Sequence, residues 1–159
     1  MKVINIHKRV ISHPKEKVSE LLETLSTKND KIWPYEKWPA MKFRKGLEEG
    51  ANGGHGPIRY SIEKYIPKEF IQFKFSKPFG FNGIHKLEVL ELENGNTELK
   101  HTIDMDVVGK GFLTWIIAIR PLHNALLEDA LDKVENQYIS EKRKTEWTVW
   151  VKILRKILK

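Results

Sequence analysis

The chain has 159 residues, with 28 lysines and arginines, 21 acidic residues and no cysteine. This length favours one domain, and a hydrophobic content of 40% is enough to fill a core, which argues against wholesale disorder. The lack of cysteine excludes disulfides, thiolate nucleophiles and zinc sites that need sulfur ligands, and it fits a reducing compartment.

The net charge of +7 is spread unevenly along the chain. Residues 142–159 contain seven basic residues and one acidic residue, so this segment alone carries +6. Residues 1–141 are therefore almost neutral, which argues against a domain that binds nucleic acid. Any binding that depends on positive charge is expected in the tail.

No segment has the pattern of a targeting or membrane-spanning sequence. The first ten residues alternate between polar and apolar types, whereas a signal peptide needs a continuous apolar run of about 7–15 residues. No stretch reaches the roughly 18 apolar residues of a membrane span. We expect a cytoplasmic protein, with the tail as the one segment that could hold it at a membrane surface.

The first third of the chain predicts a strand, a helix and an irregular link. Apolar residues at every second position favour a strand over residues 2–11. Pro14 then fits the first position of an amphipathic helix over residues 14–26. Residues 33–39 contain two Trp-Pro pairs, which favour turns because proline disfavours helix at the residue before it.

The remainder predicts five antiparallel strands followed by helices. Residues 50–56 form a glycine-rich turn between two of the strands. Helical spacing returns after Gly111, first in a short piece over residues 112–119 and then, beyond an interruption at Pro121, in a long amphipathic helix to about residue 142. This order indicates an α+β fold, with a cavity between a curved sheet of six to seven strands and the long helix.

Two hairpins set the predicted registers. A two-residue loop at Pro67-Lys68 pairs Tyr60 with Phe75, Ile62 with Phe73 and Lys64 with Ile71, which separates apolar from polar side chains. In the second hairpin a two-residue loop would mix the faces. A three-residue loop, Asn94-Gly95-Asn96, instead pairs His101 with Val89, Ile103 with Leu87 and Met105 with His85.

This second register directs two histidines inward but keeps them apart. His85 and His101 face apolar side chains and are four positions apart along the ladder, roughly 13 Å at about 3.3 Å per residue. That distance argues against a shared metal site, and no third ligand is evident. We predict neither a metal nor a cofactor.

These patterns resemble a known superfamily. The carrying residues are Ile11-Ser12-His13-Pro14-Lys15-Glu16-Lys17-Val18, the Trp-Pro link from Trp33 to Pro39, Gly56 to Tyr65, the Asn-Gly hairpin and the long closing helix. Over residues 1–142 the chain is similar to the START-like or SRPBCC superfamily, also called Bet v 1-like or polyketide cyclase/dehydrase-like proteins. The resemblance implies a helix-grip fold whose cavity holds lipids, polyketides, hormones or other apolar molecules. Some members are cyclases, hydratases or aromatases, some are carriers and some regulate partner proteins, and no shared catalytic residue can be transferred.

The candidate site lies on the inward faces of the strands. The expected cavity residues are Tyr60, Ile62, Phe73, Phe75, His85, Leu87, Val89, Leu99, His101, Ile103, Met105 and Trp115. Candidate rim residues are Trp33, Trp38, Met41, Phe79, Phe81, Phe112 and Trp115, with Arg120 and His123 beside the proline. The only catalytic candidates are His85, His101 and Tyr60. For each of these three, a purely structural role is the competing interpretation.

Residues 143–159 form the second predicted unit, a basic amphipathic helix over residues 145–159. Its apolar stripe consists of Trp147, Trp150, Val151, Leu154, Ile157 and Leu158, and its cations are Lys152, Arg155, Lys156 and Lys159. Tryptophan opposite lysine and arginine is typical of helices that lie on anionic membranes. The alternatives are packing on the domain itself or on a second copy of the chain.

Three functions remain open at this stage. The leading hypothesis is a carrier or sensor that binds a small hydrophobic ligand such as a lipid or a polyketide-like molecule. The second is a cyclase- or dehydratase-like enzyme. The third is a peripheral membrane or partner-binding protein that acts through its tail.

Overall fold

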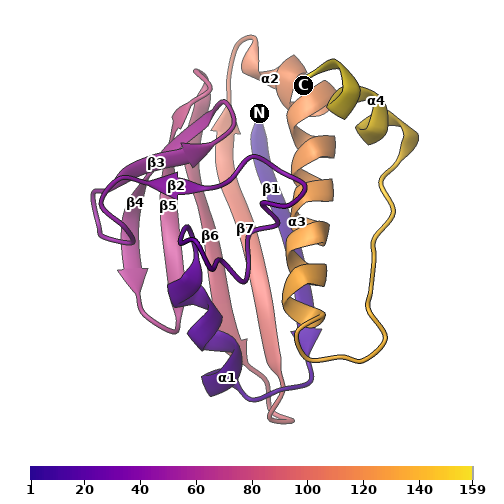
Figure 1. The fold of residues 1–159 in the computed structure, drawn as a ribbon. Helices are drawn as coiled ribbons and strands as arrows, with labels where there is room; N and C mark the ends of the chain where they lie inside the picture. Colours follow the sequence, from indigo (N-terminus) through magenta and orange to yellow (C-terminus); the bar gives the residue numbers. More distant parts are fainter. Residues whose placement is uncertain (159) are drawn as a thin grey trace.

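The computed structural model describes residues 1–158 and confirms the predicted α+β, helix-grip architecture, in which a curved antiparallel sheet wraps around a long helix (Figure 1). The sheet order is β1-β7-β6-β5-β4-β3-β2, so the first strand of the chain pairs with the last. The strands are β1 (Lys2–Ile11), β2 (Lys42–Phe43), β3 (Asn52–His55), β4 (Ile58–Ile66), β5 (Phe70–Lys77), β6 (Phe81–Glu91) and β7 (Thr97–Val107).

The glycine-rich segment is a strand rather than the predicted turn. Asn52–His55 forms β3, which pairs with β2 on one side and with β4 on the other. An added Cβ at Gly53 would lie 2.3 Å from the Lys42 carbonyl oxygen, and one at Gly54 would lie 2.1 Å from that of Ile58. Glycine is required here because the neighbouring strands approach too closely for a side chain.

The β4–β5 hairpin matches the prediction only at its far end. Tyr60 pairs with Phe75 and Ile62 with Phe73, as expected, but Lys64 pairs with Gln72 instead of Ile71. A register irregularity between Ile62 and Lys64 causes the difference. A bulge of this kind inserts one unpaired residue into a strand, which sequence alternation alone does not reveal.

The β6–β7 hairpin has a longer loop than predicted. Glu91 pairs with Thr97, so residues 92–96 form the connection and Gly95 adopts a φ of 75°. His101 consequently pairs with Leu87 and Ile103 with His85. The shift of two positions leaves every side chain on its predicted face, since side chains alternate with a period of two.

The helices differ from the predictions in length and continuity. The first predicted helix is short and tightens into a 3-10 turn, and the proline at position 121 does not interrupt the long one. One helical rod continues from Gly111 through a π-helical segment to Glu135. The segments are α1 (Lys15–Ser19), η1 (Glu20–Thr24), α2 (Gly111–Thr114), η2 (Trp115–Ile119), α3 (Arg120–Glu135) and α4 (Val149–Ile157).

A hydrogen bond from the tail compensates for Pro121 in the rod. Proline has no backbone N–H, so the carbonyl of Ile117, four residues earlier, loses its α-helical donor. The Trp150 indole N–H donates to that carbonyl at 2.8 Å. The tail therefore supplies the hydrogen bond that the proline cannot make.

The long helix ends at Glu135 instead of near residue 142, because Asn136 turns the chain back. The Asn136 side chain accepts from the Arg143 backbone N–H at 2.7 Å and donates to the Arg143 carbonyl at 2.8 Å. The chain then returns in extended form along α3 to the short helix α4 (Figure 1). Lys159, a predicted tail cation, lies outside the described residues.

Candidate functional site

A cavity of about 870 Å³ lies between the sheet and the helical rod of α2, η2 and α3. Its wall is mainly aliphatic and aromatic, and four histidines of the sheet and the rod, His55, His85, His101 and His123, line it as well. Cavities of roughly 300–1,000 Å³ with apolar walls and a few polar groups are typical of small-molecule sites. The fold and this cavity therefore define a helix-grip protein with an internal ligand-sized chamber.

The structure brings most of the predicted cavity residues together at this wall. Those that line it are Phe73, Phe75, His85, Leu87, Leu99, His101, Ile103 and Trp115, together with the predicted rim residues Trp33, Trp38, Met41 and Phe81 and with His123. Tyr60, Ile62, Val89 and Met105 are buried but do not line it. Phe79, Phe112 and Arg120 are exposed and do not line it either.

Tyr60 is held behind the wall by its neighbours. Its hydroxyl lies 3.0 Å from His55 Nδ1, and its ring packs edge-on against Phe73 and His85. Burial raises the pKa of the Tyr60 hydroxyl well above its usual value. The side chain is thus a neutral part of the scaffold around the cavity.

His85 and His101 are direct partners, so the predicted separation of roughly 13 Å is wrong. His85 Nδ1 lies 3.3 Å from His101 Nε2. The longer hairpin loop places His101 opposite Leu87, diagonally across from His85 on the adjacent strand. Two residues that share a face at such diagonal positions lie within reach of each other's rings.

The pair belongs to a row of histidines that crosses the molecule. The His123 ring from α3 lies 5.2 Å from that of His101 and 6.2 Å from that of His7 on β1. His7 in turn lies 2.7 Å from Glu128 Oε1 and 3.1 Å from Asn124 Oδ1. Sequence reasoning identified the central pair and placed His123 beside the proline, but it did not join His123 and His7 to the pair, although the six histidines of the composition were a signal of the larger row.

Burial keeps the inner histidines neutral. Desolvation lowers the pKa of His85 and of His101 well below the ordinary value, and the neighbouring histidines lower both further. Burial, reinforced by nearby His7, lowers the pKa of His123 to about 3. Burial and the Arg59 charge lower that of His55 to about 4. The interior is therefore a row of uncharged imidazoles near neutral pH.

The central pair keeps one free donor and one free acceptor. Within residues 1–158, His85 Nε2 and His101 Nδ1 are buried and have no hydrogen-bond partner. A neutral imidazole carries one N–H. Whichever ring donates in the shared bond, one of the two free nitrogens bears a proton and the other a lone pair. The pair can therefore offer either a hydrogen-bond donor or a hydrogen-bond acceptor to a ligand.

The Trp-Pro link over residues 33–39 and the tail meet at one part of the cavity wall, to which Lys37, Trp38 and Arg155 contribute. The Asp129 carboxylate of α3 is fully buried and accepts from the Trp38 and Trp147 indoles, each at 2.8 Å, and from Lys37 Nζ at 2.5 Å. The Arg155 guanidinium stacks over both tryptophans and donates to the Lys37 carbonyl. These contacts attach α4 to the domain. Lys37 is ion-paired with Asp129, whereas Arg155 makes no ion pair within residues 1–158 and its buried Nε has no hydrogen-bond partner there.

The predicted tail residues divide between the domain and solvent. Val151 and Leu154 are buried, and Trp147 and Arg155 are partly buried. Leu158 and Arg155 line the cavity, a contribution from the tail that sequence reasoning missed. Trp150, Lys152, Lys156 and Ile157 are exposed.

The described residues include neither a metal-binding cluster nor a membrane-spanning helix. Residues 1–158 contain no group of three metal-ligating side chains in position to hold an ion. None of the helices in this range has the length and apolar character needed to cross a bilayer.

Comparisons with known proteins establish the fold alone. No family model and no curated protein matches the chain. A structure of a protein from Nitrosospira multiformis aligns with a TM-score of 0.63 and 17% identity, over 91% of this chain and 100% of that one. Norcoclaurine synthase of Thalictrum flavum, a point mutant with a transition-state analogue, aligns with a TM-score of 0.63 and 9% identity, over 86% and 96%. The Bacillus cereus protein XoxI aligns with a TM-score of 0.63 and 15% identity, over 87% and 96%.

Proposed function

We propose that the chain is a START-like carrier or sensor whose cavity binds a small apolar ligand with one uncharged oxygen, a hydroxyl or a carbonyl. The observation that carries this proposal is the neutral His85–His101 pair, with two unpartnered ring nitrogens, in an otherwise apolar wall. Buried polar groups without partners are costly, and a ligand carbonyl that reached the protonated nitrogen, or a hydroxyl that reached either one, would satisfy it.

The chemistry of the wall argues for an uncharged group. Because the inner histidines stay neutral, they offer no positive charge to a carboxylate or phosphate. Of the two cations that line the cavity, Lys37 is ion-paired with Asp129, and Arg155 donates to a backbone carbonyl and stacks on tryptophan rings. An ionised group beside the histidine pair would lose its hydration without a compensating charge from these rings.

The second candidate is an acid–base enzyme of the cyclase or dehydratase type, favoured by the contiguity of His85, His101 and His123. General acid–base catalysis works best when the catalytic pKa lies near the operating pH. The pKa of each of these histidines is held well below that range, so their imidazoles are weak bases. Hydrogen bonding to a ligand therefore suits them better than proton abstraction.

The test compares matched ligands that differ in one oxygen. Naphthol and naphthalene would be titrated against a hydrophobic fluorescent dye in the cavity, and complexes would be checked by native mass spectrometry. We expect the wild type to prefer naphthol by about three- to tenfold, the value of one net hydrogen bond. The double variant His85→Leu/His101→Leu should abolish this preference and still bind naphthalene, and His101→Leu alone should reduce the preference.

His13→Leu is the control, because His13 packs on Tyr138 and does not line the cavity. It should retain the preference for naphthol. Binding of neither compound by the wild type would contradict the binding function. Turnover of a carbonyl substrate that is lost in His101→Leu would favour the enzyme instead.

A further inference from the structure

One end of the molecule exposes apolar side chains from three segments of the chain. Phe79, in the β5–β6 loop, is 97% exposed, and on the helical rod Leu113 is 61% exposed and Ile117 51%. The tail adds Trp150, Ile153 and Ile157 from the solvent-facing side of α4. We call these six residues the apical face. They come from three separate segments that meet at the same end of the sheet (Figure 1).

Two hydrogen bonds hold these segments together. The Val108 N–H donates to the Gly80 carbonyl at 3.0 Å, which joins the β5–β6 loop to the segment that enters α2. The Trp150 indole donates to the Ile117 carbonyl at 2.8 Å, which joins α4 to the rod. The apical face is thus a property of the folded domain and extends well beyond the amphipathic tail predicted from sequence.

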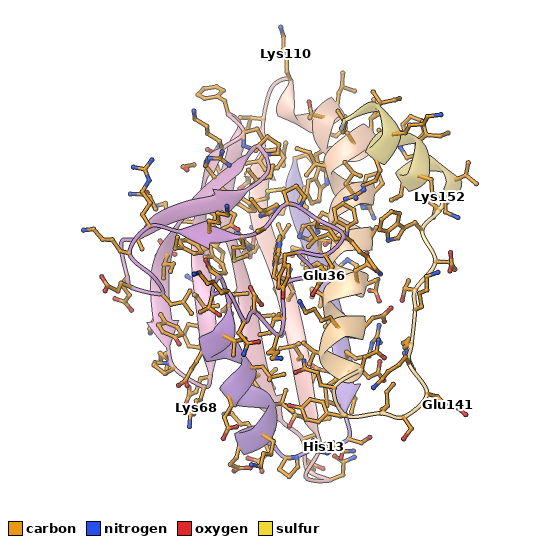
Figure 2. The ribbon with its side chains drawn as sticks, in the orientation of Figure 1. His13, Glu36, Lys68, Lys110, Glu141 and Lys152 are labelled. Carbon is orange, nitrogen blue, oxygen red and sulfur yellow. The ribbon has the colours of Figure 1, made fainter. Side chains whose placement is uncertain are left out.

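Basic side chains surround the apical face. Lys77, Lys110, Arg120 and Lys156 are exposed, and none of them makes an ion pair within residues 1–158. Figure 2 shows Lys110 projecting from the tip of this end and Lys152 on α4, at the right-hand side of the molecule. Lys152 lies 4.0 Å from Glu146, so its charge is only loosely compensated.

We propose that the apical face docks on an anionic lipid bilayer. Exposed aromatic and aliphatic side chains ringed by lysine and arginine match an interface that is apolar inside and negative at its surface. A second copy fits less well, because face-to-face packing would bring the same cations together.

The apical face lies next to part of the cavity wall. Pro78 adjoins Phe79, Thr114 adjoins Leu113 and Leu158 adjoins Ile157, and all three neighbours line the cavity. Docking would therefore bring this end of the cavity wall close to the lipid. Exchange of a ligand with the bilayer rests on the function proposed above, but docking itself does not.

The experiment uses the full chain and vesicles of phosphatidylcholine with or without phosphatidylserine, in a co-sedimentation assay. The matched variants are Ile117→Asp and Ile6→Asp. Both isoleucines are 51% exposed, but Ile6 lies on β1, away from the apical face. We expect Ile117→Asp and Phe79→Asp to lower partitioning at least about tenfold, and Ile6→Asp to leave it unchanged.

Added salt and neutral vesicles should each weaken binding of the wild type, because the attraction of the basic ring is screened. Equal partitioning of the wild type, Ile117→Asp and Ile6→Asp would overturn the proposal. So would a concentration-dependent dimer that Ile117→Asp dissolves, if the wild type does not bind vesicles. Dye binding measured without vesicles reports on the cavity separately, so failure of docking and failure of ligand binding can be told apart.

Discussion

His85 and His101 lie on adjacent strands with their ring nitrogens 3.3 Å apart, inside an apolar cavity. Each ring is more than nine-tenths buried, and each has one nitrogen without a partner within residues 1–158. This pairing makes the centre of the molecule sensitive to protonation, because there is no buried anion beside it to stabilise a charge.

Stability should therefore fall as the pH drops below about 6.5, the ordinary pKa of histidine. The pKa is about 4 for His55 and about 3 for His123 in the folded state, so the unfolded chain binds more protons than the native chain between these values and 6.5. The free energy of unfolding thus rises with pH across this window, by about 1.4 kcal/mol per pH unit for each such histidine. Urea unfolding at pH 7 and at about pH 5.5 would measure the difference.

His123→Leu provides the check on this assignment. This substitution removes one histidine whose pKa is lowered in the folded state. The free energy of unfolding of the variant should therefore depend less steeply on pH than that of the wild type. Parallel pH dependences for the two proteins would show that His123 does not contribute.

Trp150 and Pro121 should be energetically coupled. The Trp150 indole donates to the Ile117 carbonyl, which lacks its usual backbone donor because residue 121 is proline. Trp150→Phe should lower the free energy of unfolding by about 1 kcal/mol beyond the loss of packing. In a Pro121→Ala background the alanine N–H can serve that carbonyl, so the cost should shrink. A double-mutant cycle with additive effects would contradict this coupling.

The Asp129 carboxylate should be a main support of the tail. Asp129→Leu leaves the Trp38 and Trp147 indoles without their acceptor, and each orphaned donor costs about 1–3 kcal/mol. Asp129→Asn should cost less, because both indoles use the same oxygen and an amide oxygen can replace it. Thermal unfolding would rank the two variants, with exposed Glu141→Ala as a neutral control. Equal losses for Asn and Leu would show that the indole bonds contribute little.

Gly83 should tolerate no side chain. A Cβ there would lie 2.3 Å from the Asp104 carbonyl oxygen and 2.4 Å from Met105 Cα, both backbone atoms of β7. Gly83→Ala must therefore separate β6 from β7 next to His85, and we expect a loss of more than about 3 kcal/mol in unfolding free energy. Gly95→Ala, where the added carbon meets nothing within 4 Å but φ is +75°, should cost only about 1 kcal/mol. Similar melting temperatures for the two variants would contradict the steric argument.

The periodicity of apolar residues predicted which side chains share a face of the sheet or of a helix. The period of two placed Phe73, Leu87 and His101 on one face, and the helical period identified α4 as amphipathic. These predictions succeeded because they depend on local backbone geometry, which each segment carries in its own sequence.

Only the tertiary structure decided which of these groups meet. The distance between His85 and His101 depends on the length of the β6–β7 loop, and several loops are compatible with the same side-chain faces. The position of α4 depends on Asp129 and on the free carbonyl of Ile117, which lie 18 and 33 residues from their tryptophan donors. The sequence determined which side chains share a face of a strand or helix. Long-range packing and hydrogen bonds decided which segments those faces contact. An amphipathic stripe favours burial, but it does not specify the surface that buries it.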